Sequence, residues 1–177
     1  MPSFPEDRVR APARPISADA LAILKNYETG GYNDASGRLH VLPVGTPALK
    51  TYIDDAGVPT IGWGHTGGGV KRGMTCTLAQ AEAFLDADLA YAETFITRAA
   101  AAATQGQHDG MVLLAYNIGN SAFAGSTVLR KHNAGDHAAA AGAFASWCKI
   151  TQNGRKIVAD GLVRRRAEEA DLYRGRA

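Results

Sequence analysis

Glu28, Asp54 and Thr60 are the residues whose types and positions could perform acid–base chemistry. Asp54 lies six positions before Thr60, with Gly57 permitting a turn between them and an extended segment beginning at Thr60. Glu28 ends an upstream stretch that has the period of a short amphipathic helix. A glutamate at a helix end that faces an aspartate and a threonine on a sheet can activate water. Such a pair of carboxyl groups suits glycoside hydrolysis, in which one protonates the leaving oxygen and the other activates water across the ring.

The elements that must position these residues follow from the spacing of capping and apolar residues. Ser17 is a good helix N-cap, and Leu21, Leu24 and Glu28 then share one helix face. The pair Gly30-Gly31 stops this helix. Glycines, β-branched residues and turn residues dominate the next segment, and short strands are predicted there at 39–41, 51–53 and 60–61.

The second half of the chain is predicted to be helical. Capping boxes at Thr77 and Thr104 begin two helices, of which the first carries a long apolar stripe and the second ends at Gly119. Further helices are predicted at 127–133, 136–149 and 162–174. The expected fold class is α+β, in which a long helix joins a small β-sheet lobe to a helical lobe, with a cleft between them.

The domain organisation predicted from this pattern is one arm and one domain. Residues 1–16 are expected to form a flexible or extended N-terminal arm, because four prolines oppose helix formation there. Residues 17–177 are expected to form a single domain. Its sheet lobe covers about 17–76, its linking helix about 77–103 and its helical lobe about 104–177.

Composition argues against several classes of function. The net charge of +2 is too small to indicate nucleic-acid binding. From Lys149 onward, eight basic residues stand against four acidic ones, which fits either an anionic partner or a solvated helix face. The five histidines show no metal-binding spacing, so no metal or cofactor is expected. No run is long and apolar enough to span a membrane, and the N-terminus does not read as a secretory signal. Cys76 and Cys148 could form one disulfide or remain free thiols.

The run from Tyr52 to Thr66 resembles the YxDxxGxxTIGxGHT core of phage endolysins of the lysozyme type, glycoside hydrolase family 24. The Thr-Ile-Gly-x-Gly-His element makes this resemblance specific, and it extends over about residues 17–175. Further similar segments follow at 77–82, 115–119, 126–131 and 161–168.

The resemblance implies a lysozyme-like fold and roles for individual residues. Glu28 would be the general acid, while Asp54 and Thr60 would hold and activate the attacking water. Asn117 matches a cleft residue that contacts the sugar chain. His65 is expected to fix the sheet beside the site and is a candidate for substrate contact. One of the arginines 164–166 would pair with Glu28 or line the cleft.

The implied reaction is hydrolysis of the β-1,4 bond from N-acetylmuramic acid to N-acetylglucosamine, without metal or cofactor. The partner would be peptidoglycan glycan strands, with no nucleic-acid or membrane partner, and the protein would act as a monomer. It would stay in the host cytoplasm until a separate holin opens the membrane, and would then act on the cell wall in the periplasm.

Two alternative functions stay open at this point. A lytic transglycosylase needs the acid but no water-holding carboxylate, so the pair of Asp54 and Thr60 favours hydrolysis. A non-catalytic cell-wall-binding module would gain nothing from an intact set of Glu28, Asp54 and Thr60. For the hydrolytic reading, the two carboxyl groups are expected roughly 6.5–9.5 Å apart, the separation of inverting enzymes.

The chain departs from the family in the spacing of its two carboxyl residues. The family separates them by about nine positions, whereas here 54 − 28 gives 26, so an insertion of about seventeen residues lies between Gly31 and Lys50. The insertion contains a second Tyr-x-Asp-x-x-Gly pattern, in which Asp34 is rejected because the residue six positions further is His40 and not threonine. We expect an extra hairpin or loop at the cleft rim, which either reshapes substrate access or is a tolerated surface loop.

Overall fold

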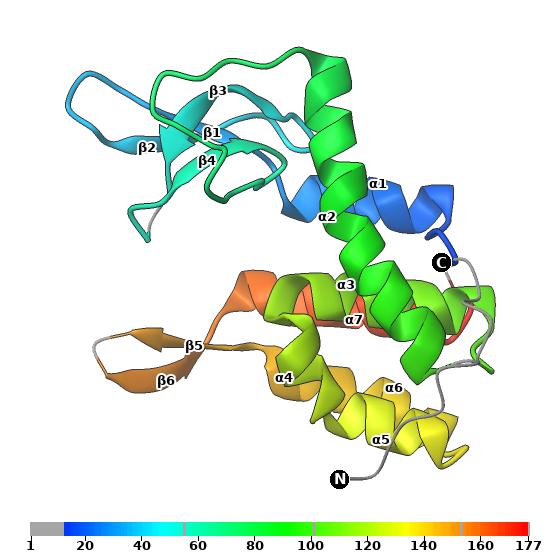
Figure 1. Cartoon of the computed structure of the whole chain (residues 1–177). Coiled ribbons are helices and arrows are strands. Elements are labelled where there is room, and N and C mark those ends of the chain that lie inside the picture. Colours follow the sequence, from blue (N-terminus) through cyan, green and yellow to red (C-terminus); the bar gives the residue numbers. More distant parts are fainter. Residues whose placement is uncertain (1–12, 55, 101, 153, 177) are drawn as a thin grey trace, which may run out of the picture.

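The sheet lobe begins the described chain and consists of one helix and two hairpins (Figure 1). A computed structural model describes residues 13–54, 56–100, 102–152 and 154–176. The lobe contains α1 (Ala18–Tyr27), β1 (Gly31–Asn33), β2 (Leu39–Val41), β3 (Ala48–Ile53) and β4 (Pro59–Gly62). Strands β1 and β2 pair antiparallel, as do β3 and β4. The predicted strand at 39–41 is therefore confirmed, and the other two predicted segments lie within β3 and β4.

The helix α2 (Leu78–Ala99) links this lobe to the rest of the molecule. Its predicted capping box is confirmed, because the Thr77 side chain accepts from the Gln80 backbone while the Gln80 side chain accepts from the Thr77 backbone. The predicted apolar stripe is also confirmed. Its buried residues are Ala81, Leu85, Leu89, Ala92 and Ile96.

The helical lobe is built around two long helices that lie side by side. It contains α3 (Gln105–Ile118), α4 (Asn120–Ala124), α5 (Thr127–Asn133), α6 (His137–Ala143) and α7 (Asp160–Tyr173). The close approach of α3 and α7 requires a glycine, because a Cβ on Gly110 would lie 2.5 Å from the backbone oxygen of Glu169. Figure 1 shows α3 and α7 lying side by side.

The prediction of a helix at 136–149 is wrong beyond Ala143, where α6 ends. The chain instead forms the 3-10 helix η1 (Phe144–Trp147) and then the antiparallel pair β5 (Lys149–Gln152) and β6 (Arg155–Val158). This hairpin, which projects from the helical lobe (Figure 1), was not predicted. Its β-branched residues favour strands, with Ile150 opposite Ile157, and Gly154 takes the positive φ of +75° that the turn requires.

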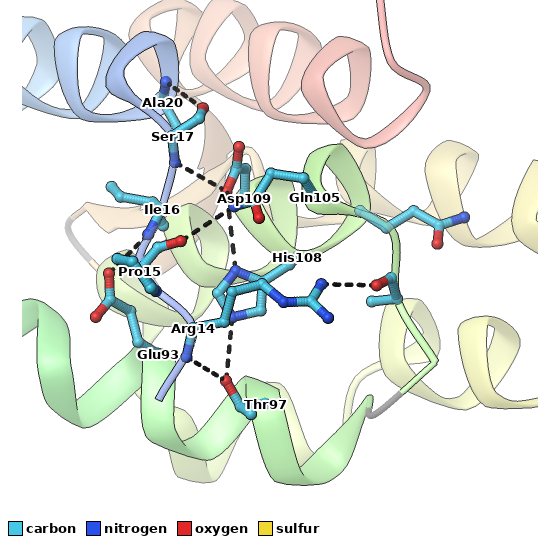
Figure 2. A network of polar contacts seen from close by, with 12 residues as sticks. Arg14, Pro15, Ile16, Ser17, Ala20, Glu93, Thr97, Gln105, His108 and Asp109 are labelled. Carbon is cyan, nitrogen blue, oxygen red and sulfur yellow. Dashed lines mark hydrogen bonds and ion pairs between the residues drawn. The ribbon is translucent and has the colours of Figure 1, made fainter. Parts of the chain in front are cut away.

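The N-terminal arm predicted for residues 1–16 is described only from residue 13 onward. Figure 2 shows that this described part is bound to the helices. The Arg14 backbone donates to Thr97 Oγ1 at 3.1 Å, and the Ile16 backbone donates to Glu93 Oε1 at 2.8 Å. Residues 14–16 are thus extended and tied to α2, while the rest of the predicted arm, residues 1–12, lies outside the described residues.

Two further predictions about the chain have clear outcomes. Cys76 and Cys148 are free thiols, which resolves the alternative left by the sequence. Within the described ranges, none of the helices combines the length and apolar character needed to cross a membrane.

Candidate active site

Glu28 lies in the wall of a cleft between the two lobes. It is the C-cap of α1, where its backbone N–H donates to Leu24 as the helix ends. Its side chain is 19% exposed and lines a cavity of about 480 Å³. The cavity also takes residues from α2, α3 and the loop after β4, among them Asp88, Tyr116 and Asn117. The cleft predicted between the lobes is therefore present, with Glu28 in its wall.

Asp54 is held in a tight turn between β3 and β4. Its Oδ1 accepts from the backbone N–H groups of Ala56 at 2.9 Å and Val58 at 2.8 Å. The turn closes through Gly57, whose φ of +80° favours glycine. Because these bonds occupy Oδ1, the second carboxylate oxygen, Oδ2, is the one that faces Thr60.

Thr60 lies on β4, is 2% exposed and has two possible acceptors for its single hydroxyl proton. Its Oγ1 is 3.1 Å from the Val58 carbonyl oxygen and 3.5 Å from Asp54 Oδ2. The shorter contact is the better hydrogen bond, since 3.5 Å is beyond the usual range. With the proton donated to Val58, Thr60 Oγ1 and Asp54 Oδ2 are two acceptor oxygens 3.5 Å apart.

A short turn after Thr60 connects this hairpin to Glu28. The backbones of Ile61 and His65 exchange hydrogen bonds of 3.0 and 2.8 Å around the turn. Gly64, within the turn, lines the cleft, and a Cβ placed on it would lie 3.6 Å from Glu28 Oε2. Its φ of +88° also favours glycine. The turn that follows the Asp54–Thr60 hairpin therefore approaches the glutamate at Gly64.

His65 joins the sheet lobe to α2. Its Nδ1 is 2.8 Å from Asp88 Oδ2, and its ring stacks on Phe84 with the centroids 4.6 Å apart. Asp88 lines the cleft, whereas His65 is not among the cleft-lining residues. These partners fit the expectation that His65 fixes the sheet, while its contact with substrate stays a prediction.

Asn117 lies at the end of α3 and is exposed to the cleft. Its Oδ1 accepts from Arg166 Nη1 at 3.1 Å. Because arginine only donates hydrogen bonds, this contact fixes the orientation of the amide. The Nδ2 group of Asn117 is thereby available as a donor to a carbonyl oxygen in the cleft.

A buried cluster of charges on α7 supports both Glu28 and Asn117. Arg165 Nη1 lies 2.6 Å from Glu28 Oε1, so the structure selects Arg165 among the three candidate arginines as the partner of Glu28. Glu169 Oε1 accepts from Arg165 Nε at 3.0 Å and from Arg166 Nη2 at 2.6 Å. The charges of Glu28 and Glu169 raise the pKa of Arg165 despite its burial. Complete burial raises the pKa of Glu169, against the opposing effect of both guanidinium groups.

The structure groups the predicted site residues into three sets. Glu28 and Asn117 line the same cleft, Asp54 and Thr60 are adjacent on one hairpin, and His65 supports the turn between these sets. Sequence reasoning missed Glu169. It lies four residues after Arg165 and three residues after Arg166, so all three side chains lie on one helix face. Tyr116 was also missed. Burial, together with the charge of Glu28, raises its pKa, so it remains a neutral phenol in the cleft wall.

Comparisons with known proteins identify the family and the fold. The family described as phage lysozyme matches residues 45–169. The endolysin of Salmonella phage P22 is 42% identical over 130 residues, which cover 71% of this chain and 86% of that protein. Two solved structures have a TM-score of 0.74 and confirm the lysozyme-like α+β fold. The endolysin from Escherichia coli O157:H7 phage FAHEc1 is 35% identical and covers 90% of this chain and 93% of its own. The muramidase domain of SpmX from Asticaccaulis excentricus is 30% identical, and the match covers 90% of this chain and 97% of that domain's chain.

Proposed function

Because this chain belongs to the phage lysozyme family, we propose that it is an endolysin that hydrolyses peptidoglycan during host lysis. The bond cleaved is the β-1,4 link from N-acetylmuramic acid to N-acetylglucosamine. One observation carries the proposal most directly. Glu28 lines the cleft with Gly64, and Gly64 lies on the turn that follows Asp54 and Thr60. The proposal combines this acid with the two acceptor oxygens of that hairpin, Asp54 Oδ2 and Thr60 Oγ1.

Glu28 acts as the general acid through Oε2. Arg165 holds Oε1, so Oε2, which lies toward Gly64 and the cleft, is the atom that delivers the proton to the leaving oxygen. Glu28 must be protonated before the reaction and would then no longer balance the charge of Arg165. Glu169 keeps Arg165 in an ion pair in that state, because it bonds Arg165 independently of Glu28, although it also bonds Arg166.

Asp54 and Thr60 orient the attacking water. Asp54 Oδ2 and Thr60 Oγ1 accept the two protons of one water molecule, whose oxygen lone pair then points at the anomeric carbon. Asp54 takes the proton released by the attack. Water attacks the face opposite the leaving group, so the reaction inverts the configuration of the anomeric carbon. This mechanism requires the two carboxyl groups to lie roughly 6.5–9.5 Å apart.

Asn117 binds the substrate in the cleft. Its Nδ2 group, oriented by Arg166, donates to the acetamido carbonyl of a bound sugar. We further propose that the protein acts as a monomer and that a separately encoded holin gives it access to the wall. Both points rest on the family resemblance, and sedimentation of the purified protein tests the first.

Digestion of purified peptidoglycan by the wild type and by Glu28→Gln, followed by mass analysis of the released muropeptides, tests the proposed function. We expect reducing N-acetylmuramic acid ends from the wild type only. The variant should lose turnover by about a thousandfold or more while its unfolding temperature stays close to that of the wild type. Anhydro ends would instead indicate a lytic transglycosylase. Binding without products from either protein would indicate a cell-wall-binding module.

A further inference from the structure

The insertion between Glu28 and Asp54 forms a hairpin that repeats the geometry of the Asp54 hairpin. Tyr32 pairs across β1 and β2 with His40, just as Tyr52 pairs across β3 and β4 with Thr60. Asp34 lies in the intervening turn, and its Oδ2 is 2.9 Å from His40 Nε2. Tyr32, Asp34 and His40 therefore form one cluster, called here the insertion cluster.

The insertion cluster is rigid and exposed. The rings of Tyr32 and His40 stack with their centroids 5.0 Å apart and an interplanar angle of 13°. Asp34 holds the imidazole, and Ser36 Oγ donates to Asp34 Oδ1 at 2.6 Å. Tyr32 nevertheless remains 50% exposed, and the side chains of His40 and Asp34 are 37% and 35% exposed. An aromatic surface beside exposed polar groups is thus fixed in place without contributing to the core.

The insertion cluster lies beside the hairpin that carries Asp54. The Asn33 side chain bonds both the backbone N–H and the backbone carbonyl of Ile53, which joins β1 to β3 at the residues just before Asp34 and Asp54. A second pair of hydrogen bonds joins the insertion to the end of α1. Trp63 Nε1 donates to the Gly45 carbonyl at 3.1 Å, and Gly45 N donates to Thr29 Oγ1 at 2.9 Å, next to Glu28.

We propose that Tyr32, Asp34 and His40 form a carbohydrate-binding subsite that extends the cleft along the sheet lobe. The subsite takes a further N-acetylated sugar of the glycan strand, and in this respect the inference rests on the proposed function. A pyranose ring has an apolar face of C–H groups that suits the exposed ring of Tyr32, and hydroxyls at its edge that suit Asp34 and His40. Because the cluster is already held by internal bonds, binding requires little further ordering of side chains.

Binding of N-acetylglucosamine oligomers tests the subsite, with Tyr32→Ala, Tyr32→Phe and Val44→Ala compared in a Glu28→Gln background so that no oligomer is cleaved. We expect Tyr32→Ala to bind the hexamer about tenfold more weakly. Tyr32→Phe keeps the ring and should stay within about twofold. Val44 is exposed on the same insertion but lies outside the cluster, so Val44→Ala should match the parent. The trimer, which fills only the cleft, should bind all variants equally.

Two results would overturn the subsite. In one, Tyr32→Ala binds the hexamer as tightly as the parent does. In the other, it weakens hexamer and trimer equally, which would indicate a disturbed cleft. Cleavage of peptidoglycan by the wild type reports on the proposed function separately. If the wild type cleaves peptidoglycan but Tyr32→Ala does not change oligomer binding, only the subsite proposal is wrong. If hexamer binding depends on the Tyr32 ring but the wild type does not cleave peptidoglycan, only the proposed function is wrong.

Discussion

The turns at Asp34 and Asp54 are built from the same hydrogen bonds. In each, one carboxylate oxygen accepts from the backbone N–H groups two and four residues later, at 2.9 and 3.0 Å for Asp34 and at 2.9 and 2.8 Å for Asp54. Each turn also closes through a glycine of positive φ three residues after the aspartate. The shared pattern Tyr-x-Asp-x-x-Gly therefore specifies a turn, which is an Asx-type structure that needs no catalytic role.

The two hairpins differ in what the second carboxylate oxygen meets. Asp34 Oδ2 is bonded by an imidazole, whereas Asp54 Oδ2 faces a buried threonine hydroxyl at 3.5 Å. Only the second hairpin continues into the turn that brings Gly64 to Glu28. Local sequence thus makes two similar turns, and the proposed choice of Asp54 as the catalytic aspartate rests on the contacts beyond each turn.

The largest difference in kcat between the two hairpins is expected when each aspartate is replaced by asparagine. Asparagine keeps an acceptor oxygen for the turn but cannot take a proton, so Asp54→Asn should lower kcat by about a hundredfold or more. Asp34→Asn should leave kcat within about twofold, because the turn at Asp34 does not lead to Gly64 and Glu28. Weaker sugar binding at the insertion cluster would appear in KM instead. Steady-state hydrolysis of peptidoglycan measures both variants. A large loss of kcat in Asp34→Asn would reverse the assignment of the two hairpins.

A smaller effect is expected from removing the Thr60 hydroxyl. Thr60→Val keeps the shape of the side chain but leaves the water with one acceptor fewer, so kcat should fall about tenfold. Thr51→Val is the matched control, since Thr51 is half-buried on the neighbouring strand and bonds only the Met74 carbonyl. An equal loss of kcat in both variants would show that the hydroxyl at position 60 has no particular role.

A substitution in the first hairpin tests whether the threonine alone selects the catalytic aspartate. His40→Thr gives the first hairpin the threonine that the second one has. In an Asp54→Asn background it should restore no measurable activity, because the turn at Asp34 does not lead to Gly64 and Glu28. Recovery of hydrolysis in this double variant would mean that the threonine alone, and not the position of the hairpin, selects the catalytic aspartate.

The smallest effect concerns the pH dependence of stability. The hydrogen bond from the Ser36 side chain, followed by the bond to His40, holds the pKa of Asp34 well below its usual range. A lowered folded-state pKa stabilises the protein above the unfolded aspartate value, about 3.9, and this contribution is lost as the pH falls below it. Asp34→Asn should therefore lower the unfolding temperature slightly at pH 6, and the difference from the wild type should shrink toward pH 2. A difference that stays constant with pH would contradict this.

The sequence predicted the elements that rest on local signals. Capping residues at Ser17, Thr77 and Thr104 located three helix starts, since a side chain that satisfies free backbone N–H groups acts within one turn. It failed after Ala143, where alanines indicated a longer helix and the chain instead formed β5 and β6. That hairpin is stabilised by pairing between two segments, each of which is a weak strand signal by itself.

What the sequence determined by itself was the family core and the capped helix starts, because each rests on residues within a few positions of one another. The choice of Asp54 over Asp34 stays a prediction. Only the tertiary structure decided that Arg165 holds Glu28, that Arg166 orients Asn117, and that Glu169 bonds both arginines. The physical reason is distance along the chain. An ion pair across 137 positions, from Glu28 to Arg165, depends on how closely α7 approaches α3, which Gly110 permits and no local pattern specifies.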